Sequence, residues 1–244
     1  MDVPHVFGFA LITALATGLG AIPFLFVPRM SRDWLGISNA LAAGLMAAAS
    51  VGLLIEGFRE SALRTLVGAG LGLVFILISQ RVLSGRKNVV LGRLQGADAM
   101  KALLVVGVMT IHSVTEGVGV GVSFGGGEAL GLFITVAIAV HNIPEGLAIS
   151  LVLVPRGTSV WKAAGWSVFS SLPQPLLAVP AFLFVEQFRP FLPVGLGFAA
   201  GAMVWMVATE LVPEALEDAR PRLVVPVIAL SGAAMMLFQL WLKG

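Results

Sequence analysis

The sequence predicts an all-α integral membrane protein of eight transmembrane helices, with both termini on the extracytoplasmic side. Of its 244 residues, 58% are hydrophobic and only 11% are charged, and the mean hydropathy is +0.98. Soluble domains carry roughly 25% charged residues because they need a hydrated surface. Most of this chain must therefore face lipid, and residues 1–244 are expected to form a single transmembrane domain.

Each predicted span is a run of about 20 mostly apolar residues, bounded by charged residues, proline or glycine. The eight runs cover residues 5–27, 34–58, 62–80, 99–122, 129–154, 160–185, 191–213 and 222–242. They are continuous and far longer than the strand of a membrane barrel, so strands are not expected. The first run lacks a basic leader and a small-residue cleavage pattern, which favours a permanent span over a signal peptide.

Lysine and arginine are concentrated in alternate loops. Eleven of the fifteen basic residues lie in loops 28–33, 81–101, 155–162 and 214–222. Because cytoplasmic loops carry the excess of Lys and Arg, these four loops are placed inside the cell and both termini outside. The net charge of +2 gives no indication of a nucleic-acid partner. The absence of cysteine excludes disulfides and thiolate metal ligands.

Two of the predicted spans carry ionisable side chains in otherwise apolar surroundings. The pattern His-x-x-x-Glu-Gly begins at His112 in the fourth span and again at His141 in the fifth. An ionisable side chain at mid-membrane costs about 2.5–3.5 kcal/mol on insertion scales, so it needs a reason. The spacing stacks His112 over Glu116, and His141 over Glu145, on one helix face. Two such helices face to face would gather imidazoles and carboxylates that suit Zn²⁺ and other first-row divalent ions.

The same side chains leave other interpretations open. They could form a purely structural polar cluster, or a proton relay in a proton-coupled transporter of an organic solute. An intramembrane metal-dependent hydrolase, in which the metal activates water, is a further alternative. A hydrolase needs three protein ligands and an open position, and the chain has no His-Glu-x-x-His pattern. We therefore expect a transporter rather than an enzyme.

Prolines predict irregular backbone close to these motifs. Pro144 removes a backbone hydrogen bond and frees the carbonyl of Val140, beside His141. Irregular backbone at membrane depth is tolerated where it lines a polar cavity or is buried in protein. The segment 170–175, Ser-Ser-Leu-Pro-Gln-Pro, predicts a bend in the sixth span that turns the Gln174 amide inward. A kink without any functional role is the alternative there.

Other polar residues are weaker candidates. Glu210 is deep enough in the seventh span to be an exit-path ligand, whereas Glu214 near its end is expected to be solvated. Glu56 and His5 are expected to lie at the outer membrane interface. Met46 shares a helix face with Ser50, and methionine more often packs than binds metal.

The two His-x-x-x-Glu-Gly segments and their continuations, residues 112–123 and 141–148, closely resemble the ZIP (Zrt/Irt-like) family of divalent metal transporters. Residues 170–175 and 203–213 are similar to the family's motifs on the sixth and seventh helices. The resemblance covers most of the chain and points to the bacterial GufA-like branch and its plant relatives. It implies eight helices with extracytoplasmic termini, uptake of a divalent metal, above all zinc, into the cytoplasm, and a homodimer in a bacterial inner membrane.

The resemblance also implies a set of metal ligands. The primary ligands by position are His112, Glu116, His141 and Glu145. Met46 corresponds to a thioether ligand from the second helix. Ser113, Asn142 and Gln174 stand where some members place the ligands of a second, adjacent metal.

Two of these positions depart from the pattern of many members. Where others have Glu and Asp, this chain has the amides Gln174 and Asn142, each of which lacks a negative charge. Two adjacent divalent ions repel each other unless carboxylates neutralise them. We therefore expect one tightly held ion, with any second ion bound weakly.

Overall fold

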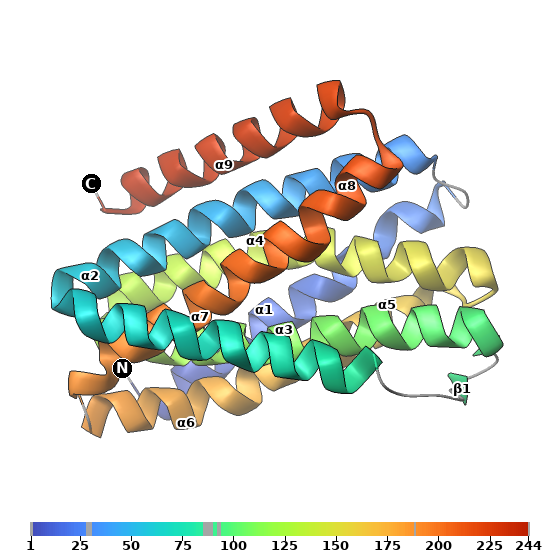
Figure 1. Cartoon of the computed structure of the whole chain (residues 1–244). Coiled ribbons are helices and arrows are strands. Elements are labelled where there is room, and N and C mark those ends of the chain that lie inside the picture. The colour runs from blue at the N-terminus through green and yellow to red at the C-terminus, as the bar shows by residue number, and fades with distance from the viewer. Residues whose placement is uncertain (1, 28–30, 85–89, 92–93, 188, 244) are drawn as a thin grey trace.

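A computed structural model of the protein describes residues 2–27, 31–84, 90–91, 94–187 and 189–243 (Figure 1). In this part of the chain the α-helices are α1 (Val3–Leu19), α2 (Arg32–Ser84), α3 (Gly96–Gly126), α4 (Glu128–Leu153), α5 (Val160–Ser171), α6 (Pro173–Gln187), α7 (Leu192–Met206), α8 (Val212–Asp218) and α9 (Pro221–Lys243). Short 3-10 turns are η1 (Ile22–Leu25), η2 (Val154–Arg156) and η3 (Arg189–Phe191), and η4 (Val207–Leu211) is π-helical. The fold is nearly all-helical, as predicted.

Six helical segments among the described residues are long and apolar enough to cross a membrane. They are Val3–Leu25, Arg32–Ser79, Glu128–Arg156, Val160–Gln187, Leu192–Asp218 and Pro221–Trp241. These segments support a membrane protein, because an apolar helix needs about 20 residues to span the hydrocarbon core. The total of eight crossings and the side on which the termini lie stay predictions.

Helix α2 contains two of the expected spans. Ser61 has non-helical dihedral angles (φ −167°, ψ 110°) and lies between the runs 34–58 and 62–80. Figure 1 shows the two halves of α2 running in opposite directions on either side of this break. Helix α3 covers the expected fourth span, but the side chains of residues 96–105 lie outside the described part of the structure.

Two further expected spans are interrupted helices. The sixth is α5 followed by α6, so the helix is interrupted at Leu172, within the segment 170–175 where a bend was predicted. The seventh is α7, the π-helical turn η4 and α8, which together extend to Asp218 and thus beyond the predicted end at residue 213. π-Helical turns insert one extra residue per turn and frequently mark functional sites.

The expectation that the chain has no strands was wrong in one place. β1 (Val90–Leu91) and β2 (Leu94–Gln95) pair antiparallel, with Val90 opposite Gln95 and Leu91 opposite Leu94. Both strands lie in the long connection 81–98, between the apolar runs 62–80 and 99–122, so the continuity of those runs says nothing about this loop. They are far too short to cross a membrane. The basic residues Arg86, Lys87 and Arg93 of this loop lie outside the described residues.

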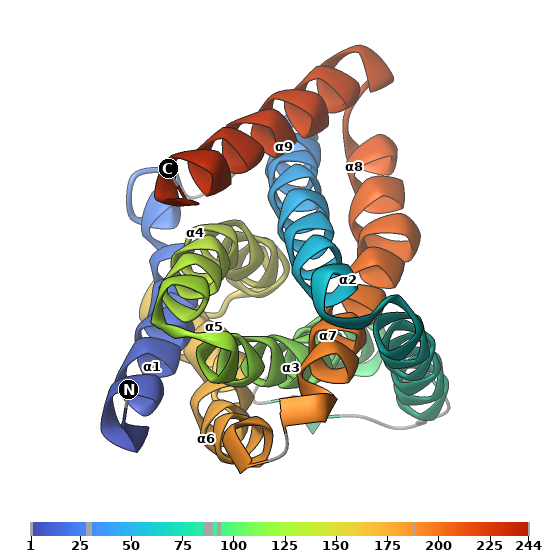
Figure 2. The same ribbon diagram turned by 90° about the vertical axis from the view of Figure 1, so that its left-hand side faces the viewer.

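The helices pack closely in pairs. Helix α2 lies along α7 and α9, α3 along α6, and α1 along α4. Figure 2 shows α1, α4, α5 and α6 on one side of the molecule, α7, α8 and α2 on the other, and α3 between them. At Gly68 of α2, an added Cβ would lie 2.0 Å from the carbonyl oxygen of Val194 on α7. Small residues therefore allow direct backbone contact between these helices, as is common in membrane bundles.

Candidate metal centre

Two helices bring four ligand side chains to one buried point. Helix α3 supplies His112 and Glu116, and helix α4 supplies His141 and Glu145. Within each helix the spacing of four places His and Glu on the same face. The side chains are at most 2% exposed, and one ligand atom from each lies within 4.8 Å of the others. The facing arrangement predicted from the repeated motif is therefore present.

The closest contacts run between the two helices as well as along them. Nε2 of His141 lies 2.5 Å from Oε1 of Glu116, and Nε2 of His112 lies 3.1 Å from Oε1 of Glu145. His112 is also 3.4 Å from Glu116 on its own helix. Each imidazole thus meets the carboxylate of the opposite helix. Two imidazoles and two carboxylates at these distances match the donors that Zn²⁺ uses in proteins.

Several buried polar atoms near these residues have no hydrogen-bond partner in the described part of the chain. They include Nδ1 of His112, Nδ1 of His141, Oγ of Ser113 and Oδ1 of Asn142. Nε2 of His112 is near two carboxylates but lacks hydrogen-bonding geometry. Buried polar atoms are satisfied in the great majority of cases, so a group of exceptions calls for an explanation. A bound cation would supply partners for the nitrogen and oxygen lone pairs among them.

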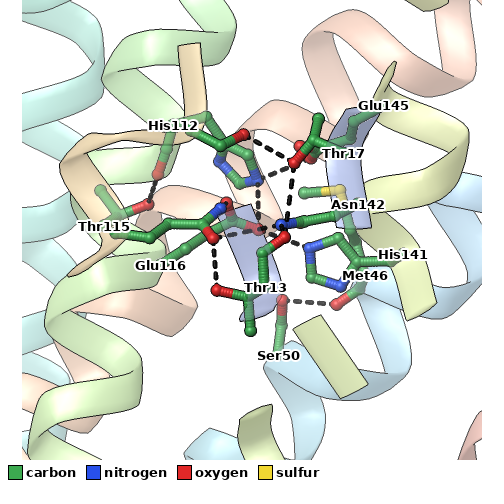
Figure 3. A network of polar contacts seen from close by, with 12 residues as sticks. Thr13, Thr17, Met46, Ser50, His112, Thr115, Glu116, His141, Asn142 and Glu145 are labelled. Carbon is green, nitrogen blue, oxygen red and sulfur yellow. Dashed lines mark hydrogen bonds and ion pairs between the residues drawn. The ribbon is translucent and has the colours of Figure 1, made fainter. Parts of the chain in front are cut away.

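A second layer of polar side chains surrounds Glu116. The Nε2 amide of Gln174 donates to Oε2 of Glu116 over 2.6 Å, and the Thr13 hydroxyl is 2.5 Å from Oε1 of Gln174. The Nδ2 amide of Asn142 donates to Oε1 of Gln174 at 3.2 Å and to the carbonyl oxygen of Thr13 at 2.8 Å. Helices α1, α3, α4 and α6 thus share one hydrogen-bonded network (Figure 3).

Helix α2 contributes Met46 and Ser50 to the same region. Figure 3 shows the Met46 side chain beside the His and Glu cluster, and Met46 is fully buried. The Ser50 hydroxyl donates to the Met46 carbonyl at 2.8 Å and is thereby satisfied within its own helix. The Met46 thioether is therefore the side chain of α2 that we consider as a ligand.

The glycine of each motif makes room for a neighbouring backbone. A Cβ on Gly117 would lie 2.8 Å from Cα of Gln174, where the chain passes from α5 to α6. A Cβ on Gly146 would lie 1.7 Å from the carbonyl oxygen of Thr17 on α1. The residue after each glutamate must therefore lack a side chain if α6 and α1 are to reach the centre. Helix α4 continues through Pro144, which is buried.

The other acidic candidates and the third histidine lie apart from the cluster. Glu210 is in η4, and Glu214 in α8 accepts a hydrogen bond from Asn39 of α2 at 3.3 Å. Glu56 forms an ion pair with Arg59 at 3.1 Å. His5 is exposed and is bound to Asp2, the residue that caps α1.

Thr13 is the member of this network that sequence reasoning missed. A single threonine in an apolar span has no ligand spacing, and threonine hydroxyls commonly bond to their own helix. Thr13 does contact the Ala10 carbonyl at 2.7 Å. Its role emerges only because α1 packs beside α4 and the break before α6.

Comparison with known proteins shows the family to which the chain belongs. The sequence signature of the family described as "ZIP Zinc transporter" matches residues 92–239, which include both motifs and Gln174. The chain belongs to the ZIP family. This membership confirms the resemblance found in the sequence.

Relatives from bacteria and a plant extend the ZIP match to most of the chain. The zinc transporter GufA of Myxococcus xanthus is 33% identical over 223 residues, which cover 84% of this chain and 86% of GufA. The zinc transporter ZIPB of Bordetella bronchiseptica is 32% identical over 243 residues, which cover 91% of this chain and 76% of ZIPB. A relative from Arabidopsis thaliana is 50% identical over 238 residues, but this ZIP chain spans only 38% of its length.

Proposed function

We propose that the protein carries zinc across a membrane into the cytoplasm, with His112, Glu116, His141 and Glu145 as ligands of the transported ion. The observation that supports this most directly is the convergence of their four ligand atoms within 4.8 Å, buried in a chain whose described residues include six apolar helical segments of membrane length. Membership of the ZIP family, whose relatives GufA and ZIPB are named zinc transporters, supports zinc as the substrate.

The charges of the four ligands suit a divalent cation. Ionised Glu116 and Glu145 together offset the charge of +2, while neutral His112 and His141 provide directional bonds. A hydrated ion entering from the outside would exchange its water for these ligands. Because each ligand must be deprotonated to bind metal, protonation from the cytoplasmic side would weaken the site and favour release.

The neighbouring polar side chains have secondary roles in this proposal. Oγ of Ser113 and Oδ1 of Asn142 have no hydrogen-bond partner among the described residues, so each has a free oxygen to offer a passing ion. Met46 would add a thioether from α2. Gln174 donates to Glu116 at 2.6 Å and so contacts a ligand rather than the ion itself.

The orientation of the chain in the membrane and its assembly are also part of the proposal. We propose that both termini lie outside the cytoplasm, that eight spans cross the membrane and that the protein acts as a homodimer. The relatives include bacterial and plant proteins, so the bacterial inner membrane stays a prediction. Nothing in the site favours the hydrolase or the organic-solute transporter over metal transport.

The decisive test is uptake of radioactive zinc by lipid vesicles that contain the purified protein. His112→Ala and Glu145→Ala each remove one ligand from a different helix, and we expect both variants to fall to the rate of protein-free vesicles. His5→Ala is the matched control, because this exposed histidine is bound to Asp2 away from the cluster. Zinc uptake that survives both ligand substitutions would overturn the proposed site.

A further inference from the structure

Both polar atoms of the Gln174 side-chain amide have hydrogen-bond partners. Its Nε2 donates to Glu116 at 2.6 Å, and its Oε1 faces the Thr13 hydroxyl at 2.5 Å and the Asn142 amide at 3.2 Å. Gln174 and Thr13 are both fully buried. An amide oxygen has two lone pairs, and here both have partners. The oxygen of Gln174 is therefore not free to bind a metal ion.

The chemistry of the partners determines which end of the amide faces Glu116. An ionised carboxylate can only accept hydrogen bonds, so the nitrogen of Gln174 must point to it. The oxygen of Gln174 must then face Thr13, whose hydroxyl has a single proton. The Thr13 hydroxyl donates to Oε1 of Gln174 at 2.5 Å and also to the Ala10 carbonyl at 2.7 Å, so these two acceptors share its proton. Thr13 thus acts on Glu116 through Gln174.

The backbone around Gln174 holds this arrangement in place. Gln174 follows the break at Leu172, where α5 ends and α6 begins. Its Cα and carbonyl oxygen lie against Gly117, the residue next to Glu116, so closely that a Cβ on Gly117 would be 2.8 and 2.7 Å from them. Asn142 uses its amide nitrogen twice, toward Gln174 and toward the Thr13 carbonyl. The amide of Gln174 has little freedom to rotate away from Glu116.

We propose that Gln174 is a positioning residue, fixed by Thr13 and Asn142, which orients Glu116 and limits the centre to one divalent ion. The bond to Oε2 leaves Oε1 of Glu116 directed at the two histidines. The neutral amide occupies the far side of the Glu116 carboxylate without adding negative charge or a free lone pair. A second cation there would meet the repulsion of the first ion and no additional anion. This inference rests on the proposed function.

The test compares four variants of the full chain purified in detergent. Gln174→Leu removes the hydrogen bond from the amide to Glu116, and Thr13→Val removes the hydrogen bond from Thr13 to the amide. Gln174→Glu adds an anion at the same position. Thr17→Val is the matched control, because the Thr17 hydroxyl contacts the Ser171 hydroxyl at 2.7 Å and the backbone carbonyl of Thr13 at 3.5 Å, but not the Gln174 amide. Zinc bound per chain is measured by elemental mass spectrometry after dialysis, and zinc affinity by calorimetry. KM and maximal rate are then measured in vesicles.

We expect one zinc per chain for the parent protein and for Thr17→Val, with equal affinities. Residues that orient a metal ligand typically change affinity about 10–100-fold when removed. Gln174→Leu and Thr13→Val should therefore keep one zinc but weaken its affinity and raise KM about tenfold or more. Gln174→Glu should bind two zinc ions per chain.

Two bound ions in the parent protein, or one in Gln174→Glu, would overturn the limit to a single ion. Unchanged affinity in Thr13→Val would overturn the positioning role, and this variant decides the matter if Gln174→Leu does not fold. If the proposed function is wrong, the parent protein will show no zinc uptake, whatever number of ions it binds. That result differs from each of the outcomes above.

Discussion

Gly146 of α4 lies directly against the backbone of Thr17 in α1, so that a Cβ built on it would be 1.7 Å from the Thr17 carbonyl oxygen. A similar close approach occurs at Gly20, the residue that follows α1, where a Cβ would be 2.1 Å from the backbone nitrogen of Leu147 on α4. Helices α1 and α4 are thus in backbone contact next to Glu145. This contact brings Thr13, one turn earlier on α1, within reach of Asn142 and Gln174.

Gly146→Ala should separate α1 from α4 and lower stability. The added methyl group cannot fit, and overpacking of this kind costs typically about 1–3 kcal/mol. We expect a lower melting temperature in detergent and weaker zinc uptake. Gly8→Ala in α1 is the control, since its Cβ would meet no atom within 4 Å. Equal melting temperatures for the two variants would contradict the close approach.

Zinc should stabilise the folded protein, and a chelator should reverse the effect. A ligand that binds only the folded state at 100 times its dissociation constant stabilises it by about 2.7 kcal/mol. Melting in detergent with and without zinc measures this. The variant with both His112→Ala and His141→Ala should melt at the same temperature in either condition, because it lacks both imidazoles. A zinc-dependent rise in that variant would place the binding site elsewhere.

Met46→Leu should change the choice among metals rather than abolish transport. A thioether is a soft ligand that favours softer ions, whereas imidazole and carboxylate suit zinc. We expect the variant to lose more cadmium uptake than zinc uptake, as measured in competition between the two ions. Leucine has a similar volume, so packing of this buried position is retained. An unchanged ratio of cadmium to zinc would assign Met46 to packing alone.

The convergence of the His and Glu side chains could be predicted because its signal is local. Imidazole and carboxylate four residues apart must share a helix face, and repetition of the pattern in the next span leaves few alternatives to a joint site. The interruption of the helix before Gln174 could be predicted for a similar reason, since Pro173 and Pro175 disfavour a continuous helix. Each of these inferences needs only residues that are neighbours in sequence.

The network around Glu116 could not be predicted, because it depends on which distant helices meet. Thr13 and Gln174 are 161 residues apart, and their contact follows from the packing of α1 beside the break before α6. The same limit applies to the amides of Asn142 and Gln174. The sequence shows that both side chains are uncharged, which indicates a less acidic site. Only the structure shows that the Asn142 nitrogen donates to the Thr13 carbonyl and the Gln174 nitrogen to Glu116.

The absence of cysteine from the chain makes the predicted orientation directly testable. Glu128 begins α4 and Lys162 lies in the first turn of α5, and both are exposed. The distribution of Lys and Arg places Glu128 outside and Lys162 in the cytoplasm. A membrane-impermeant maleimide added to intact cells should therefore label Glu128→Cys but not Lys162→Cys. After permeabilisation both should be labelled, which controls for access to each thiol. The reverse pattern in intact cells would contradict the predicted orientation and place both termini in the cytoplasm.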